Sequence, residues 1–157
     1  MDADAARARL DEASAAILAG VARVLPGWVE GRVAFVADAW GRLDVAARGA
    51  LAAHAREAGA RATVRVTGEL RALFATDATA QRSTPLEIVR SATREVTAVL
   101  EGAGIPPVVR DEFDERAFPD DRYGVTPSSL ADLGDADLGP LQLAWGLAKA
   151  RVLHPTP

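Results

Sequence analysis

Six carboxylates and three arginines, with two phenylalanines and a tyrosine between them, lie in the stretch RDEFDERAFPDDRYG, residues 110–124. If residues 108–117 form a short helix, three of the carboxylates share one face at spacings of three and four: Asp111, Asp114 and Glu115. Ligand sets made only of oxygen suit hard cations such as Mg²⁺ or Ca²⁺. The twelve-residue calcium-loop pattern is missing, however, and neighbouring arginines can neutralise these carboxylates. The sequence therefore predicts no metal site here.

The same stretch could form a docking surface for a protein partner. Aromatic anchors with charged side chains at the rim are typical of protein interfaces, and this stretch supplies both. Phe113, Phe118 and Tyr123 are its possible aromatic anchors, although one of the two phenylalanines is expected in the core. The surface candidates are Arg110, Asp111, Asp114, Phe118, Asp120 and Tyr123.

A solvated turn is the third interpretation, and it suits FPDDRYG, residues 118–124. Pro119 can take the second position of a turn, and Gly124 can adopt a positive φ. The carboxylates of Asp120 and Asp121 can bond neighbouring amides. From the sequence alone, both the turn and the docking surface stay open.

Catalytic chemistry has few residues to use. The chain has no cysteine, which excludes disulfides, thiolate zinc sites and cysteine nucleophiles. Neither of its two histidines, His54 and His154, follows a glutamate by three positions, as the Glu-x-x-His motif of a di-iron bundle requires. No nucleophile elbow, phosphate-binding loop or dinucleotide fingerprint occurs in the sequence. We therefore predict no catalytic residue and no cofactor.

The tryptophans are the remaining candidates. Trp28, Trp40 and Trp145 each lie on an apolar helical line, where a core position is the ordinary expectation. A pocket lined by all three could still hold an apolar ligand, with an indole N–H as a polar handle. A small-molecule-binding helical bundle is therefore the alternative to an interaction protein.

The elements that would position these residues are predicted to be helical. Apolar residues make up 49% of the 157 residues and aromatic residues only 5%, so alanine, valine and leucine must form the core. Alanine loses no side-chain entropy in a helix. We expect a single all-α domain (residues 1–157), with three or four longer helices in a bundle over residues 4–101. Residues 102–157 would form an irregular acidic segment with shorter helices that caps this bundle.

Apolar spacing predicts one helix that ends at Pro26 and Gly27, and a second over residues 28–42, for which a strand is the weaker alternative. A long helical pattern follows over residues 44–75, and Gly59 could divide it.

The second half of the chain carries strong helix-start signals. TPLE, residues 84–87, has a capping threonine, a proline at the first helical position and a glutamate that can reach back. It predicts a helix to about residue 101. Thr126 and Pro127 repeat the signal for a short helix to Gly134, and GPLQLAWGLAKARVL predicts a last helix over residues 139–153.

Charge and targeting signals bound the partners. Residues 1–100 hold 12 acids and 13 bases, whereas residues 101–157 hold 10 acids and 5 bases. An acidic segment repels phosphate backbones, so we expect no nucleic-acid partner. No signal peptide pattern and no stretch of about 20 apolar residues is present. The expectation is a cytoplasmic bacterial protein without a membrane partner.

Residues 81–150 resemble a family of small actinobacterial helical proteins with no assigned activity. The resemblance rests on RSTPLEIVRSATREVTAVLEGAGIPPVVRDEFDERAFPDDRYGVTP followed by LAWGLAKA, and extends more loosely to PGWVEGRV. It implies a bacterial, cytosolic, helical protein and supplies no mechanism. Taken together, the residues predict a non-enzymatic interaction or adaptor protein that uses residues 110–124 to bind a protein partner. Alanine-rich helices can also pair between subunits, so a homo-oligomer stays open.

Overall fold

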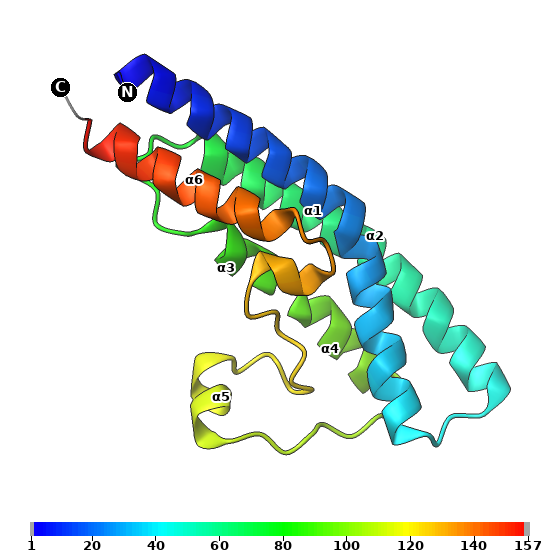
Figure 1. Ribbon diagram of the computed structural model, residues 1–157. Coiled ribbons are helices and arrows are strands. Elements are labelled where there is room, and N and C mark those ends of the chain that lie inside the picture. The colour runs from blue at the N-terminus through cyan, green and yellow to red at the C-terminus, as the bar shows by residue number, and fades with distance from the viewer. Residues whose placement is uncertain (1, 156–157) are drawn as a thin grey trace.

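A computed structural model describes residues 2–155, and Figure 1 shows how its helices are arranged. No strand occurs within residues 2–155, which confirms the predicted all-α bundle. The elements are α1 (Ala3–Trp40), α2 (Val45–Ala75), α3 (Pro85–Arg90), α4 (Thr93–Gly102), α5 (Glu112–Ala117), the 3₁₀ turn η1 (Leu130–Leu133) and α6 (Leu138–Leu153).

The prediction that Pro26 and Gly27 separate two helices is wrong, because α1 continues through both residues. Buried side chains recur on both sides of the proline, from Val21 and Leu25 to Val29. This continuous seam offsets the loss of one backbone hydrogen bond, which costs about 3 kcal/mol for an interior proline. Proline also bends helices, and Figure 1 shows α1 changing direction partway along its length.

By length and composition alone, α1 could cross a bilayer. In its most apolar 18-residue window, however, 44% of the residues are buried inside the bundle. The core helix of a soluble protein meets the same criteria, so this is weak support for a membrane span.

The predicted helix over residues 44–75 is confirmed as α2, and Gly59 does not divide it. Gly59 instead lets α2 approach α1 closely. A Cβ placed there would lie 3.0 Å from the carbonyl oxygen of Pro26 and 3.3 Å from its Cα. The two longest helices therefore touch backbone to backbone at the bend of α1.

The single helix expected from Pro85 to about residue 101 is interrupted at Ser91 and Ala92, which separate α3 from α4. The capping box that starts α3 is present as predicted. At the interruption, the Ser91 hydroxyl donates to the Ile88 carbonyl (2.5 Å), and the amides of both residues bond three positions back. Serine commonly competes with the helix for backbone groups in this way.

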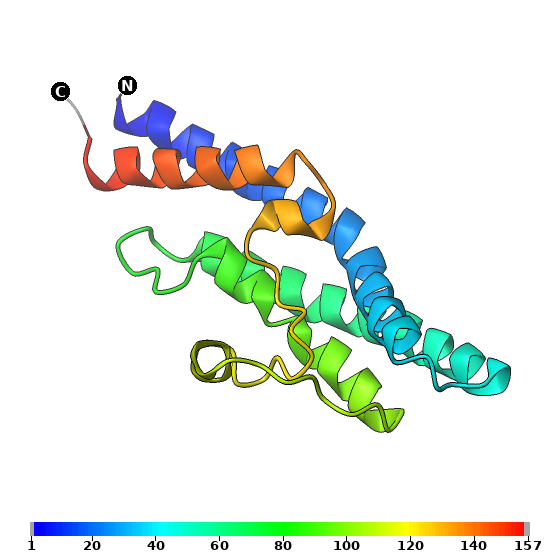
Figure 2. The same ribbon diagram turned by 60° about the horizontal axis from the view of Figure 1, so that its bottom comes forward.

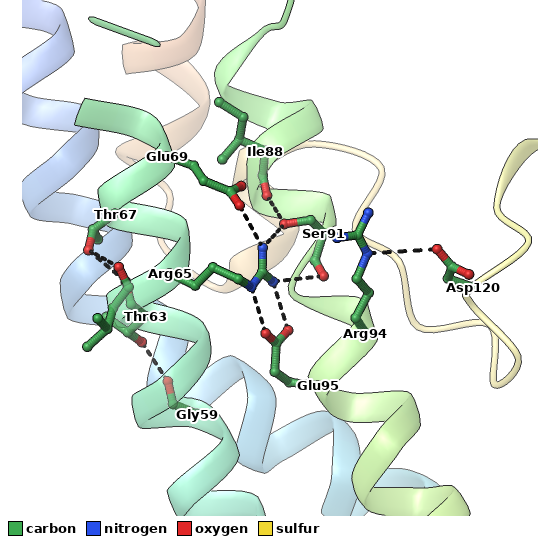
Figure 3. A network of polar contacts seen from close by, with 11 residues as sticks. Gly59, Thr63, Arg65, Thr67, Glu69, Ile88, Ser91, Arg94, Glu95 and Asp120 are labelled. Atoms are coloured by element: carbon green, nitrogen blue, oxygen red, sulfur yellow. Dashed lines mark hydrogen bonds and ion pairs between the residues drawn. The ribbon is translucent and has the colours of Figure 1, made fainter. Parts of the chain in front are cut away.

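Arg65 of α2 holds this interruption in place (Figure 3). Its guanidinium donates to the Ser91 carbonyl at 3.1 Å and to the Ser91 hydroxyl at 2.8 Å. It also forms a two-pronged pair with the Glu95 carboxylate at 2.8 and 2.9 Å. These hydrogen bonds with Glu95 raise the pKa of Arg65 and tie α2 to both short helices.

The last helix, α6, is shorter than α1 and α2, but it lies along α1 and completes the core. Its Trp145 is buried and donates its indole N–H to the Ser14 hydroxyl of α1 at 3.1 Å. Gly20 of α1 leaves room for the Leu138 side chain where α6 begins. The preceding turn differs from its prediction: η1 starts at Leu130 instead of directly after Thr126. The amides of Ser128 and Ser129 both bond the Asp132 carboxylate, which fixes the later start.

Candidate functional site

Residues 106–124 form an arm that leaves the bundle after α4 and carries α5. Figures 1 and 2 both show α5 on an extended loop that stands away from the long helices. None of the residues of α5 is buried. The acidic-aromatic stretch predicted from the sequence therefore lies largely on this arm, and its residues divide into an anchored base and an exposed tip.

Tyr123 anchors the base, so its prediction as a surface residue is wrong. The side chain is only 4% exposed, and its hydroxyl donates to the Ile105 carbonyl at 2.5 Å. Burial raises the pKa of the Tyr123 hydroxyl, and the nearby Glu101 carboxylate adds to the effect. The outgoing and returning segments of the arm also meet here, because the Val108 amide donates to the Arg122 carbonyl at 3.1 Å.

The turn predicted for residues 118–124 is present at the base. The Asp121 amide donates to the Phe118 carbonyl at 3.0 Å, which places Pro119 at the second position of a turn. Asp121 is buried, and its carboxylate accepts from the amides of Val125 and Thr126, both at 2.8 Å. Gly124 has a φ of 67°. The turn interpretation therefore holds for this half of the stretch.

Two of the surface candidates, Asp120 and Phe118, face the bundle. The Asp120 carbonyl accepts from the Thr97 hydroxyl at 3.0 Å, and its exposed carboxylate lies 3.8 Å from Arg94 of α4, as Figure 3 shows. The half-buried Phe118 ring lies 5.7 Å below the Arg90 guanidinium. The Asp120 carbonyl and the Phe118 ring therefore fix the arm on α3 and α4, whereas the Asp120 carboxylate stays exposed.

The tip of the arm, residues 109–117, is organised by two other predicted residues. Asp111 caps α5, because its carboxylate accepts from the Asp114 amide at 2.8 Å. Arg110 donates to the Phe118 carbonyl at 2.6 Å and closes the loop beneath α5. Arg110 and Asp114 are half-buried, and Asp111 is exposed.

The tip also presents bare apolar side chains. Phe113 is 69% exposed and Val109 is fully exposed. Phe113 was expected as an anchor, whereas Val109 was missed. The signal for Val109 was available: two valines follow the paired prolines of IPPVV, where no helical period could bury them.

No metal centre is formed by these carboxylates. Glu112 pairs with Arg116 at 3.6 Å, and both side chains are exposed. Among residues 2–155, no group of three or more potential ligand side chains is placed to hold a metal ion. His54 and His154, the two histidines considered for catalysis, are both exposed and lie on separate elements.

The three tryptophans do not line a common pocket. Trp145 is a buried residue of α6. Its ring centroid lies 6.2 Å from that of Phe74 and 5.2 Å from the Lys149 ammonium. Trp28 is buried at the bend of α1, and Trp40 is half-buried at the end of that helix. None of the larger clefts described within residues 2–155 has more than one tryptophan in its wall.

A cleft of about 500 Å³ lies between the first half of α1 and α6. It is open to solvent, and three charged side chains stand at its edges: Arg9, Glu12 and Arg151. Its apolar lining comes from Ala13, Ala16, Leu141, Ala144, Leu147 and Ala148. We refer to it as the α1–α6 groove.

No protein-family model, no curated protein and no solved structure matches the chain. The resemblance of residues 81–150 to small actinobacterial proteins therefore stays a prediction.

Proposed function

We propose that this protein is a non-enzymatic interaction protein whose arm tip, residues 109–117, docks onto a protein partner. The observation that supports this most directly is the exposure of Phe113 at the end of an arm whose base is fixed. The partner surface would offer an apolar pocket for Phe113 and Val109, with arginines or lysines around it.

The apolar side chains of the tip support a docking role. A phenylalanine buried on binding is a frequent anchor of protein interfaces, and its burial contributes roughly 1.5–3 kcal/mol. Phe113 contributes nothing to the core here, because α5 has no buried residue. Val109 belongs to the same tip and is fully exposed.

The anchored base supports the same role. Binding usually costs free energy because loops and side chains become ordered, and a preorganised loop avoids part of that cost. Tyr123 and Asp121 fix the arm where it joins the bundle, and Asp111 caps α5. Part of the cost of ordering the arm is therefore met before any partner arrives.

The charge of the arm selects the partner. Within residues 110–124, six carboxylates face three arginines, a net charge of −3. Such a surface speeds association with a basic partner and disfavours acidic ones. Because exposed charges are screened by salt, binding should weaken as ionic strength rises.

The test is affinity capture from native cells with two single variants. Phe113→Ser should remove the bound partner, whereas Phe35→Ser should leave it. Phe35 is a matched control because it is 67% exposed and lies on α1, outside the arm. Both variants should have the circular dichroism of the parent chain. Equal capture by both variants would contradict the proposal.

The carboxylates are tested separately. Substituting Asp111, Asp114 and Asp120 together with serine should weaken capture and reduce its dependence on salt. Serine still caps a helix, so α5 should be kept. Substituting Asp4, Asp11 and Glu57 with serine changes the net charge by the same amount on α1 and α2 and should have no effect. If both triple variants behave alike, net charge matters and the arm does not.

A further inference from the structure

We propose that the partner surface of the arm is the α1–α6 groove of a second copy of this chain. This inference rests on the proposed function of the arm and names its partner. It is motivated by two surfaces of the same molecule that match each other in apolar character and in charge.

The composition of α6 is unusually apolar for a helix at the surface. α6 contains no acidic residue, and its only charges are Lys149 and Arg151 near its end. One side of α6 packs on α1, yet Leu143 and Leu147 on other sides are 65% and 58% exposed. A helix that is apolar all round is normally covered on every side. A further chain covering α6 would satisfy this pattern.

The lining of the groove admits an aromatic side chain. Its walls are mostly alanine methyl groups, with Leu141 and Leu147 as the larger side chains. Small side chains leave an opening of about 500 Å³ between the two helices. The Phe113 ring and the Val109 side chain are the apolar groups that the arm tip offers to such an opening.

The charges also match. Arg9 and Arg151 stand at the edge of the groove, and within residues 2–155 neither has a carboxylate oxygen within 4.0 Å. The arm tip carries Asp111, Glu112, Asp114 and Glu115 around Phe113. An arginine fork pairs well with carboxylates, so the two edges are complementary. Glu12 is the one acid that lines the groove, and Arg116 is the exposed arginine of the tip that would face it.

The contact has to form between two chains. Figures 1 and 2 both place α5 beside α3 and α4, away from the groove between α1 and α6 near the chain ends. The arm is fixed at its base by Tyr123 and Asp121, so its tip does not reach the groove of its own chain. Two copies that exchange arms would form a closed dimer, and successive one-way contacts would form a filament.

Complementation between two variants tests the contact. Phe113→Ser removes the anchor but keeps the groove, and Leu147→Ser alters the groove but keeps the arm. Sedimentation velocity should show self-association of the parent chain that weakens at least tenfold in each variant alone. An equimolar mixture of the variants should recover a heterodimer, because one intact arm then meets one intact groove.

Cysteine cross-linking tests the geometry, and it is clean because the chain has no cysteine of its own. Ala117→Cys lies one turn from Phe113 on α5, and Ala144→Cys lies in the groove. A mixture of these two variants should form an intermolecular disulfide under mild oxidation. A mixture of Ala117→Cys with Ala53→Cys, which is exposed on α2, should form at least tenfold less.

The outcomes separate this inference from the proposed function. A parent chain that stays monomeric at its highest soluble concentration overturns the inference, and so does a mixture of variants that gives no heterodimer. If Phe113→Ser then still abolishes capture of another protein, the proposed function stands without this partner. In a monomeric chain, decanoate that protects Ala144→Cys from a thiol reagent would mark the groove as a small-molecule site and would also overturn the inference.

Discussion

The close approach of α1 and α2 at Gly59 gives a sharp stability prediction. In Gly59→Ala, the new methyl group would lie 3.0 Å from the Pro26 carbonyl oxygen and 3.3 Å from its Cα. Both atoms belong to the backbone of α1, so they cannot move aside as a side chain would. The two helices must separate by a few tenths of an ångström at their contact.

The magnitude follows from two opposing effects. Alanine is favoured over glycine inside a helix by about 1 kcal/mol. Overpacking of a closely packed core typically costs about 1–3 kcal/mol. The net expectation is a loss of roughly 1 kcal/mol in the free energy of unfolding.

The control lies on the same helix. At Gly68 of α2, an added Cβ meets nothing within 4 Å, so Gly68→Ala should show only the gain in helix propensity. It should raise the free energy of unfolding by about 0.5–1 kcal/mol. Urea unfolding followed by circular dichroism measures both variants. If Gly59→Ala is as stable as Gly68→Ala, α1 and α2 do not meet at these residues.

Three further predictions concern buried and half-buried polar groups. Ser14→Ala leaves the Trp145 indole N–H without its acceptor and should cost about 1–3 kcal/mol in urea unfolding; no loss of stability would show that the indole finds another partner. Tyr123→Phe removes the bond to Ile105 and should cost about 1 kcal/mol at neutral pH. Because the Tyr123 pKa is raised in the folded state, Tyr123 should stabilise the parent chain fully below pH about 10, and this stabilisation should be lost as the pH rises through the folded-state pKa. The Tyr123→Phe variant should lack this part of the alkaline destabilisation. Identical profiles of unfolding free energy against pH would refute the role given to Tyr123. A double-mutant cycle with Arg65→Gln and Glu95→Gln should give a coupling of about 1–3 kcal/mol, and additive effects would mean that the pair contributes nothing.

The sequence predicted the helices wherever one apolar line runs without interruption. The line over residues 44–75 gave α2, and Leu86, Val89, Thr93, Val96 and Leu100 are all buried as that pattern requires. Periodicity succeeds there because burial of one face decides both the helix and its orientation. The capping box at Thr84 was readable for a local reason, since it involves only residues 84–87.

The errors arise where tertiary contacts override a local signal. Pro26 breaks helices by local rules, but the buried seam on either side carries α1 through it. The interruption at Ser91 combines a local and a distant contact: the Ser91 hydroxyl bonds the Ile88 carbonyl, and Arg65, 26 residues away, bonds the Ser91 carbonyl. The contact with Arg65 has no signature in the local sequence.

The arm shows the same limit at the level of the site. Its composition marked residues 110–124 as a candidate, and the turn at Pro119 was predicted correctly. Which aromatic side chain is exposed could not be predicted, because Tyr123 and Phe113 have similar local surroundings. The Ile105 carbonyl accepts a hydrogen bond from the Tyr123 hydroxyl, and that ring is buried, whereas Phe113 is 69% exposed.

The central claim is that the arm tip, residues 109–117, contacts another protein chain. A photoreactive phenylalanine analogue at position 113, irradiated in native cells, tests that claim directly, with the same analogue at position 35 as the control. We predict a discrete cross-linked species, of a second copy or of another protein, from position 113 and none of comparable yield from position 35. Equal, diffuse labelling from both positions would contradict the claim and leave the arm as a solvated turn.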